Sequence, residues 1–209
     1  MMKSAEEGKI WEWRAFGEVS RSVAEKVRAY PIRPGLGDLR GEDLYLIAPA
    51  SDQNVKLRRY ASGWLLKFKL LLETRPGSFE LYKESAEMTY GFPVSADQLK
   101  EAARLLAVTL PEASAAGNLD EKGFVTALAE ASPAVIQTRV SKRRSQYQFD
   151  GGWLELADAQ FETRTVESLS IHSPDIEVVR SMLDRLRPGD ELEAMNYIEA
   201  CRRWGDSEC

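Results

Sequence analysis

The sequence predicts an α+β fold in which eight antiparallel strands close into a barrel and amphipathic helices pack on its outside. Three observations support this prediction. Period-two alternation recurs in both halves of the chain, basic residues repeat at alternate positions within it, and segments of helical periodicity lie between and after these stretches. A closed barrel with a polar interior would bring the repeated charges onto one shared face.

Residues 54–84 give the clearest strand signal. They are typical of three consecutive antiparallel strands with turns at residues 62–63 and 76–77. Side chains two apart in a strand share a face, so the basic residues of the first two strands can form one surface. These residues are Lys56, Arg58, Lys67 and Lys69. The third strand adds Glu80 at the margin, and a cationic face edged by carboxylates suits a phosphate ligand that carries a metal ion.

The other elements enclose these three strands. Further strands are predicted at residues 9–16, 43–47, 133–149, 153–161 and 164–173. Helices are predicted from Ser22 to before Pro31, over 96–108, from Asp120 to before Pro133, from Pro174 onward, and over 191–204. We expect residues 1–209 to form a single domain, with C-terminal helices over about 174–205 packed on the barrel.

Charge is segregated along the chain, whose net charge is −5. Residues 54–69 hold five basic residues and no acid, and residues 139–149 hold four basic residues and no acid. A solvated strand face that mixes both signs is the ordinary alternative for any one strand. Single-sign strands in an acidic protein favour a local field for an anion instead.

Composition excludes several classes of function. There is no signal-like apolar run and no stretch near the roughly 20 apolar residues of a membrane helix, so we expect a cytoplasmic protein without a membrane partner. Acidic net charge disfavours nonspecific binding to nucleic acid, and we expect no specific nucleic-acid partner. Cys201 and Cys209 lack zinc-ligand partners and are expected to be free thiols. Nucleotide-binding glycine motifs and Ser-His-Asp or Cys-His sets are absent from the sequence.

In the order of its motifs the sequence resembles the CYTH superfamily, the triphosphate tunnel metalloenzymes. The resemblance covers roughly residues 9–197 and is carried by IWEWR, NVKLRR, LLKFK, FELYKE, VSKRR, WLELAD and TVESLSIHS. It implies an eight-stranded tunnel that binds a triphosphate through basic residues and Mg²⁺ or Mn²⁺ through inward carboxylates. By position, the resemblance implies that Arg14, Lys56, Arg58, Lys67, Lys69, Lys142 and Arg144 bind substrate and that Glu12, Glu80 and Glu155 bind metal.

The sequence departs from this family at two acidic positions. Ile10 stands where the first glutamate of the opening motif is expected, and His172 stands where the last strand usually ends in an inward glutamate. His172 can replace a carboxylate ligand, act as a general base, or fill a strand position among polar groups. The predicted metal-binding glutamates can equally serve as ion-pair partners of the basic residues. The facing of Glu84, Asp158 and Glu167 stays open at this stage.

The sequence favours two functions, and it leaves open a third possibility, a barrel that serves only as a protein-interaction scaffold. The first is a divalent-metal-dependent phosphohydrolase acting on a small triphosphate compound, such as inorganic, nucleoside or thiamine triphosphate. The second is a module of the same fold that binds polyphosphate or a nucleotide with weak turnover or none. In both, the partner is a small phosphorylated anion, and Ile10 with His172 separates the two. The catalytic residues themselves are not identified from the sequence.

Overall fold

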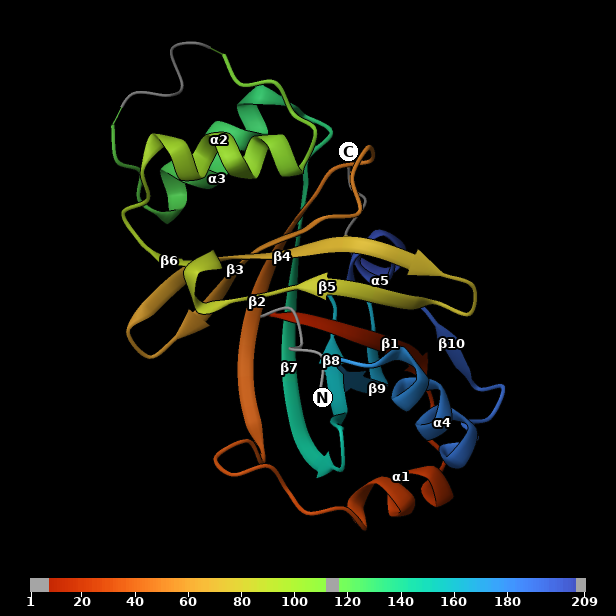
Figure 1. The fold of residues 1–209 in the computed structure, drawn as a ribbon. Coiled ribbons are helices and arrows are strands. Elements are labelled where there is room, and N and C mark those ends of the chain that lie inside the picture. The colour runs from red at the N-terminus through yellow and green to blue at the C-terminus, as the bar shows by residue number, and fades with distance from the viewer. Residues whose placement is uncertain (1–7, 112–116, 206–209) are drawn as a thin grey trace, which may run out of the picture.

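The computed structural model describes residues 8–111 and 117–205. Within these residues ten strands form one antiparallel sheet, and eight of them close into a barrel in the order β1-β5-β4-β3-β2-β7-β8-β9 (Figure 1). The barrel strands are β1 (Lys9–Gly17), β2 (Leu39–Ile47), β3 (Asn54–Tyr60), β4 (Gly63–Arg75), β5 (Phe79–Lys83), β7 (Ile136–Phe149), β8 (Gly152–Gln160) and β9 (Thr165–Ser173). This arrangement confirms the predicted closed antiparallel barrel.

Strand β1 closes the barrel. Its residues 11–17 pair with β9, while residues 9–13 pair with β5 on the other side. The C-terminal end of β1 pairs instead with the short strand β10 (Leu192–Ala194), and a second short strand, β6 (Thr89–Gly91), pairs with β4. As a result Glu12 has two cross-strand neighbours, Glu80 on β5 and His172 on β9.

Alternation along each strand separates the interior of the barrel from its outer face. On β1, Ile10, Glu12 and Arg14 point inward, whereas Trp11 and Trp13 are buried in an outer apolar cluster with α1 and α4. Polar side chains thus converge inside because the outer face is already committed to apolar packing.

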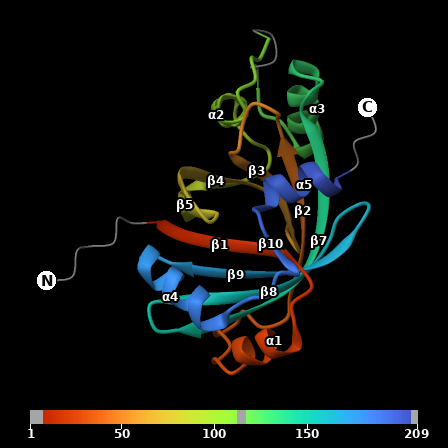
Figure 2. The ribbon, with the colours of Figure 1, turned by 90° about the vertical axis from the view of Figure 1, so that its right-hand side faces the viewer.

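Helices cover the outer face in two groups (Figures 1 and 2). The helices are α1 (Arg21–Arg28), α2 (Ala96–Leu105), α3 (Glu121–Ala131), α4 (Ile176–Leu186) and α5 (Tyr197–Trp204), with a 3₁₀ turn η1 at Ala86–Met88. Helices α1 and α4 pack on β1, β8 and β9, and α2 and α3 pack on β2, β3 and β4. None of the helices in the described ranges is long and apolar enough to cross a membrane.

Helix α5 is packed differently from the other four. Its residues Tyr197 and Trp204 lie in a buried cluster with Phe16, Tyr45 and Phe161, on the same strand faces that carry the inward polar residues. Phe16 makes edge contacts with both Tyr197 and Trp204. The beginning of α5 therefore forms part of the wall of the barrel interior.

Several predicted boundaries differ from the structure. Ser95 and Gln98 form the predicted capping box of α2, but the N-cap of α1 is Ser20 rather than Ser22. Strand β2 begins at Leu39, because pairing with β7 extends it through a glycine that looked like loop. The helix predicted over 191–204 begins at Tyr197, since residues 192–194 pair with β1 as strand β10.

Candidate functional site

The barrel encloses a cavity of about 310 Å³. Six basic side chains line it, and all six were predicted to bind substrate: Arg14, Lys56, Arg58, Lys69, Lys142 and Arg144. The acidic residues lining the cavity in the described ranges are Glu12, Glu84 and Glu155. The seventh basic residue of the prediction, Lys67, does not line the cavity, and its Nζ lies 3.0 Å from Glu84 Oε1.

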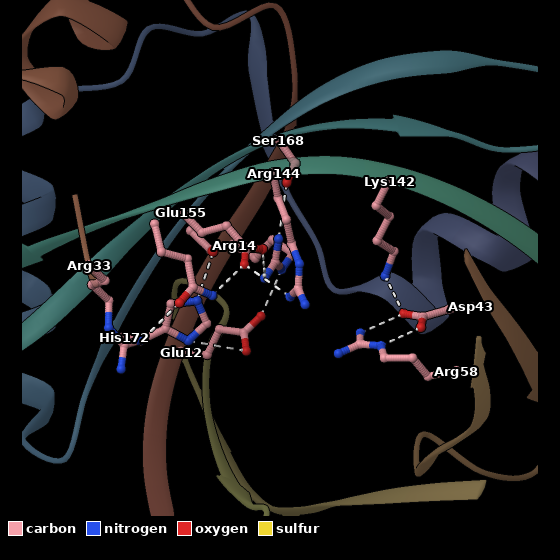
Figure 3. Close-up of polar contacts among 12 residues, drawn as sticks. Glu12, Arg14, Arg33, Asp43, Arg58, Lys142, Arg144, Glu155, Ser168 and His172 are labelled. Carbon is pink, nitrogen blue, oxygen red and sulfur yellow. Dashed lines mark hydrogen bonds and ion pairs between the residues drawn. The ribbon is translucent and has the colours of Figure 1, made fainter. Parts of the chain in front are cut away.

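Inside the barrel the charged residues form two groups, seen apart in Figure 3. The first, here called the Asp43 cluster, consists of Asp43, Lys56, Arg58 and Lys142. Arg58 donates to both oxygens of Asp43, from Nε at 2.6 Å and Nη2 at 2.8 Å. Lys142 Nζ donates to Asp43 Oδ2 at 2.9 Å, and Lys56 Nζ lies 3.6 Å from the same oxygen. One carboxylate therefore holds three cations.

Burial and charge act against each other in the Asp43 cluster. Burial would raise the pKa of Asp43, but Lys142, Lys56 and Arg58 hold it well below its usual value. Burial lowers the pKa of Lys142 to about 8, although Asp43 opposes that change, and it lowers the pKa of Lys56 well below its usual value. The two lysines are thus the cations of the cavity whose charge depends most on their surroundings.

The second group, here called the Arg14 cluster, consists of Glu12, Arg14, Lys69, Arg144 and Glu155. Arg14 bridges both carboxylates, with Nε 2.7 Å from Glu12 and Nη2 3.3 Å from Glu155. Lys69 also donates to Glu12, and Arg144 donates to Glu155 at 3.3 Å. Ser168 accepts a further bond from Arg14 at 3.0 Å.

Both carboxylates of the Arg14 cluster are ionised at neutral pH. Burial opposes ionisation of Glu12, but Lys69 and Arg14 hold its pKa well below the usual value. Arg14 and Arg144 lower the pKa of Glu155 to about 2 against the same burial effect. Buried ion pairs therefore already occupy two of the three glutamates that were predicted to bind metal.

His172 is buried between aromatic and polar neighbours. Its ring stacks on Trp153 with the centroids 4.8 Å apart, and its Nε2 lies 2.8 Å from Ser170 Oγ. Its Nδ1 lies 3.6 Å from Glu12 Oε2. Burial lowers the pKa of His172 to about 4, so the imidazole is neutral at pH 7. The Arg33 guanidinium lies 4.5 Å from the centroid of the same Trp153 ring.

Glu80 differs from the other inward glutamates because it makes no ion pair with the part of the chain that the structure describes. Its carboxyl accepts bonds from Asn196 Nδ2 at 2.6 Å and Tyr82 Oη at 2.8 Å. Burial raises its pKa, and the charge of Glu12 on the neighbouring strand acts in the same direction. Ile10 lines the cavity on the same face of β1 as Glu12.

The residues present limit how a metal can be held. Among residues 8–111 and 117–205 there is no group of three or more His, Cys, Asp and Glu side chains placed to bind one. Glu12 and Glu80 are nevertheless paired across β1 and β5. Mg²⁺ in phosphate sites commonly uses one or two carboxylates together with phosphate oxygens and waters. The donor set thus suits a cation that arrives on a phosphate, rather than one held by protein side chains alone.

Sequence reasoning missed Asp43, Asn196 and Tyr197. Asp43 is 1% exposed and does not line the cavity, whereas Asn196 and Tyr197 line it from the start of α5. Asp43 and Tyr45 lie two residues apart on a predicted strand, and this spacing could have indicated that both face the interior of the barrel. Of the acids left open by the sequence, Glu84 lines the cavity, while Asp158 and Glu167 are exposed and do not.

Comparisons with known proteins bear on the fold. No protein-family model matches the chain, and no curated protein matches it. Solved structures do match. One is PH1012 from Pyrococcus horikoshii, with 18% identity and a TM-score of 0.51, covering 90% of this chain and 98% of that one. Another is a proposed adenylate cyclase from Bacillus halodurans, with 15% identity and a TM-score of 0.51, covering 92% of this chain and 98% of that one. HpAC1 from Hippeastrum, a proposed adenylyl cyclase with a dominant triphosphatase activity, also matches, with 12% identity and a TM-score of 0.50, covering 95% of this chain and 98% of that one. These likenesses establish the fold over nearly the whole chain.

Proposed function

We propose that this chain, which has the triphosphate-tunnel fold of the CYTH superfamily, binds the triphosphate group of a small compound in its cavity and hydrolyses it with a divalent cation. The observation that carries the proposal is the imbalance of charge around the cavity. Six basic side chains line it against three acidic ones. Phosphate oxygens are the acceptors that lysine and arginine bind most strongly.

The Asp43 cluster is proposed to hold the phosphates. Lys56, Arg58 and Lys142 share one carboxylate, which leaves two positive charges when all four groups are ionised. All three cations line the cavity and their partner Asp43 does not, so a ligand in the cavity would meet the cations. A fully ionised triphosphate would supply both the missing negative charge and the acceptors.

Glu12 and Glu80 are the residues proposed to hold the cation, and Glu155 is proposed to contribute mainly by fixing Arg14 and Arg144. When bound, Mg²⁺ or Mn²⁺ would neutralise charge that develops on the phosphoryl group in transfer. Hydrolysis joins a water oxygen to the terminal phosphorus and breaks the bond to the bridging oxygen. The protein's own contribution is to position the chain of phosphates and to stabilise the leaving oxygen with fixed cations.

One observation favours the second candidate, a binding module without efficient turnover. Ile10 lines the cavity beside Glu12, at a position where a further carboxylate would strengthen a metal site. Glu12 in turn is engaged by Arg14 and Lys69. His172 does not replace the missing ligand convincingly, because it is stacked on Trp153 and bonded to Ser170.

Two measurements test the proposal. Phosphate release is followed with tripolyphosphate, nucleoside triphosphates and thiamine triphosphate, each with Mg²⁺ or Mn²⁺, and tripolyphosphate binding is followed by calorimetry. Release from at least one compound is expected. Tight binding without release from any of them would reject the hydrolase and leave the binding module. Absence of both would reject the cavity as a phosphate site.

Variants on opposite faces of one strand locate the binding. Arg58→Ala is expected to weaken tripolyphosphate binding about ten- to hundredfold, because a charge-assisted contact is lost. Arg59→Ala is the matched control, since Arg59 is the next residue, is exposed and lies over Trp64 outside the barrel. Equal effects of the two variants would place the ligand outside the cavity.

A further inference from the structure

Asp43 occupies a particular place in the barrel. It lies on β2, the strand between β3 and β7, and its carboxylate contacts cations from both neighbours: Lys56 and Arg58 on β3, and Lys142 on β7. Tyr45, two residues along β2, accepts a bond from Lys142 at 2.6 Å and lies 3.4 Å from Asp43 Oδ2. Asp43 does not line the cavity, so a ligand there would meet the three cations and not the carboxylate.

We infer that Asp43 is a positioning residue for the proposed phosphate site: its carboxylate holds Lys56, Arg58 and Lys142 as one convergent group and favours the charged form of both lysines. The inference rests on the proposed function, because it concerns how the same cavity binds phosphate. Asp43 itself would not contact the ligand. It would control two cations, Lys56 and Lys142, that do contact it.

The geometry explains why such control is needed. Both lysines are buried, Lys56 with 7% and Lys142 with 8% of its surface exposed, and burial disfavours an ammonium ion. The charge of Arg58 also lowers the pKa of both lysines, and a second cation acts in the same direction on each, Lys142 on Lys56 and Arg14 on Lys142. The carboxylate that directly contacts both, among the described residues, is Asp43.

The remaining groups around the two lysines cannot replace that carboxylate. The charged or titratable groups that face them are Arg14 on β1, Tyr45 on β2, Arg58 on β3, Glu84 after β5, and Tyr197 and Cys201 on α5. Glu84 is the one acid in this set, and it is bonded to Lys67. Burial raises the pKa of Tyr45, Tyr197 and Cys201, so these three stay neutral at pH 8.

Asp43→Asn tests the inference through the pH dependence of tripolyphosphate binding. At pH 8 to 8.5 the variant is expected to bind about tenfold or more weakly than the parent, because a lysine of the cluster loses its proton and its contact with phosphate. At pH 6, where the lysines recover their protons, this difference in affinity should become smaller. Structural damage alone would lower the affinity by the same factor at every pH.

Two further variants separate charge from position. Glu155→Gln removes an equally buried carboxylate whose cationic partners are the arginines Arg14 and Arg144. Arginine does not titrate in this range, so the ratio of the tripolyphosphate affinities of Glu155→Gln and the parent should be the same at pH 6 and pH 8.5. Asp43→Glu keeps the charge but moves it, so its binding should show the parent's pH profile at a lower affinity.

The outcomes distinguish this inference from the proposed function. No tripolyphosphate binding by the parent at any pH would overturn the proposed function. If the parent binds tripolyphosphate and the ratio of its affinity to that of Asp43→Asn stays constant from pH 6 to 8.5, the inference is overturned and the proposed function stands. If Asp43→Asn does not fold, Asp43→Glu decides: the parent's pH profile at a lower affinity would support the inference, and the same profile with unchanged affinity would overturn it, because the position of the carboxylate would then be irrelevant.

Discussion

The Asp43 cluster and the Arg14 cluster lie in the same cavity but balance their charges differently. In the Asp43 cluster one carboxylate holds three cations, and two of these are lysines. In the Arg14 cluster two carboxylates hold three cations, and two of these are arginines. The first is therefore the more positive and responds to pH, while the second is nearly neutral and keeps its charges. This difference separates a region suited to grip an anion from a region that holds carboxylates in place.

The largest expected effect comes from removing one arginine from each cluster. Arg58→Ala should lower the free energy of unfolding by about 1.5–3 kcal/mol, because Asp43 loses two charge-assisted hydrogen bonds although Lys142 and Lys56 stay in contact with it. Arg144→Ala should cost about 1 kcal/mol or less, because Arg144 is partly exposed and Gln146 and Arg14 continue to bond Glu155. Chemical denaturation measures both changes.

The outward neighbours Arg59 and Arg143 provide matched controls for these two variants, and their replacement by alanine should change the free energy of unfolding by about 0.5 kcal/mol or less. If Arg58→Ala were as mild as Arg59→Ala, the Asp43 cluster would not hold a fully desolvated carboxylate. The contrast between the clusters would then be lost.

A second prediction alters the Arg14 side by restoring a carboxylate. Ile10→Glu places a second acid two residues from Glu12 on the cavity face of β1. Repulsion between the two should lower the melting temperature without metal, and Mn²⁺ with tripolyphosphate should raise it by several degrees more than in the parent. Phosphate release should also increase. Ile10→Gln is the matched control, and it should show no added response to metal.

If Ile10→Glu is destabilised and gains nothing from Mn²⁺, residue 10 does not reach the cation. Glu12 and Glu80 would then lose their proposed metal role, while the proposal for the Asp43 cluster would stand.

The third prediction concerns Lys142 and pH. In the unfolded chain a lysine keeps its proton to about pH 10.4, whereas the pKa of Lys142 in the folded protein is about 8. Between these pH values the unfolded state binds more protons than the folded state, so Lys142 makes the free energy of unfolding rise with pH. The destabilisation that comes from burying the charged lysine is fully present below pH 8. Binding has the opposite sign: affinity for tripolyphosphate should fall as pH rises through about 8, because the free protein loses the ammonium.

Lys142→Arg should remove most of this dependence, because the guanidinium stays charged. Calorimetry from pH 7 to pH 9.5 measures it, and the titration of tripolyphosphate is common to both proteins and cancels in their ratio. Parallel profiles for parent and variant would show that Lys142 does not contact the phosphate.

The smallest expected effect is that of Glu80→Gln. Because the folded protein raises the pKa of Glu80, the ionised carboxylate disfavours folding at neutral pH, and its loss should stabilise the protein by less than about 1 kcal/mol. Asn196 can still donate to the amide oxygen, and the Tyr82 hydroxyl can accept from the amide nitrogen. The same variant should lose the melting-temperature response to Mn²⁺ with tripolyphosphate. A retained response would remove Glu80 from the proposed metal site.

The sequence was most informative where polar and apolar residues alternate along a strand, because the alternation places the two kinds of residue on opposite faces. Lys56 and Arg58 alternate with Val55 and Leu57, and the structure places the two cations on the cavity and the two apolar residues in the outer core. Asp43 was missed because a single acid produces no repeat, and its importance arises from Lys142, 99 residues away in the chain.

The C-terminal region was predicted less well for a similar reason. Residues 192–194 continue a helix-like pattern, but pairing with β1 makes them a strand. Helix α5 has a strong apolar face, and that face alone does not say whether it covers the outside of the barrel or enters its interior. Contacts with Phe16 and Tyr45, both distant in sequence, determine that choice.

The closure of the barrel by β1 also bears on how the protein folds. Trp11 is paired with Ser173, so the first and last barrel strands meet only after a loop of about 160 residues is closed. Hairpins such as β3–β4 and β7–β8 join strands that are adjacent in the chain and can form early. Pairings of such large sequence separation slow folding, and we expect the β1–β9 seam to form last. Glu12 and Arg14 lie on that seam, so the cavity is complete only in the final step of folding.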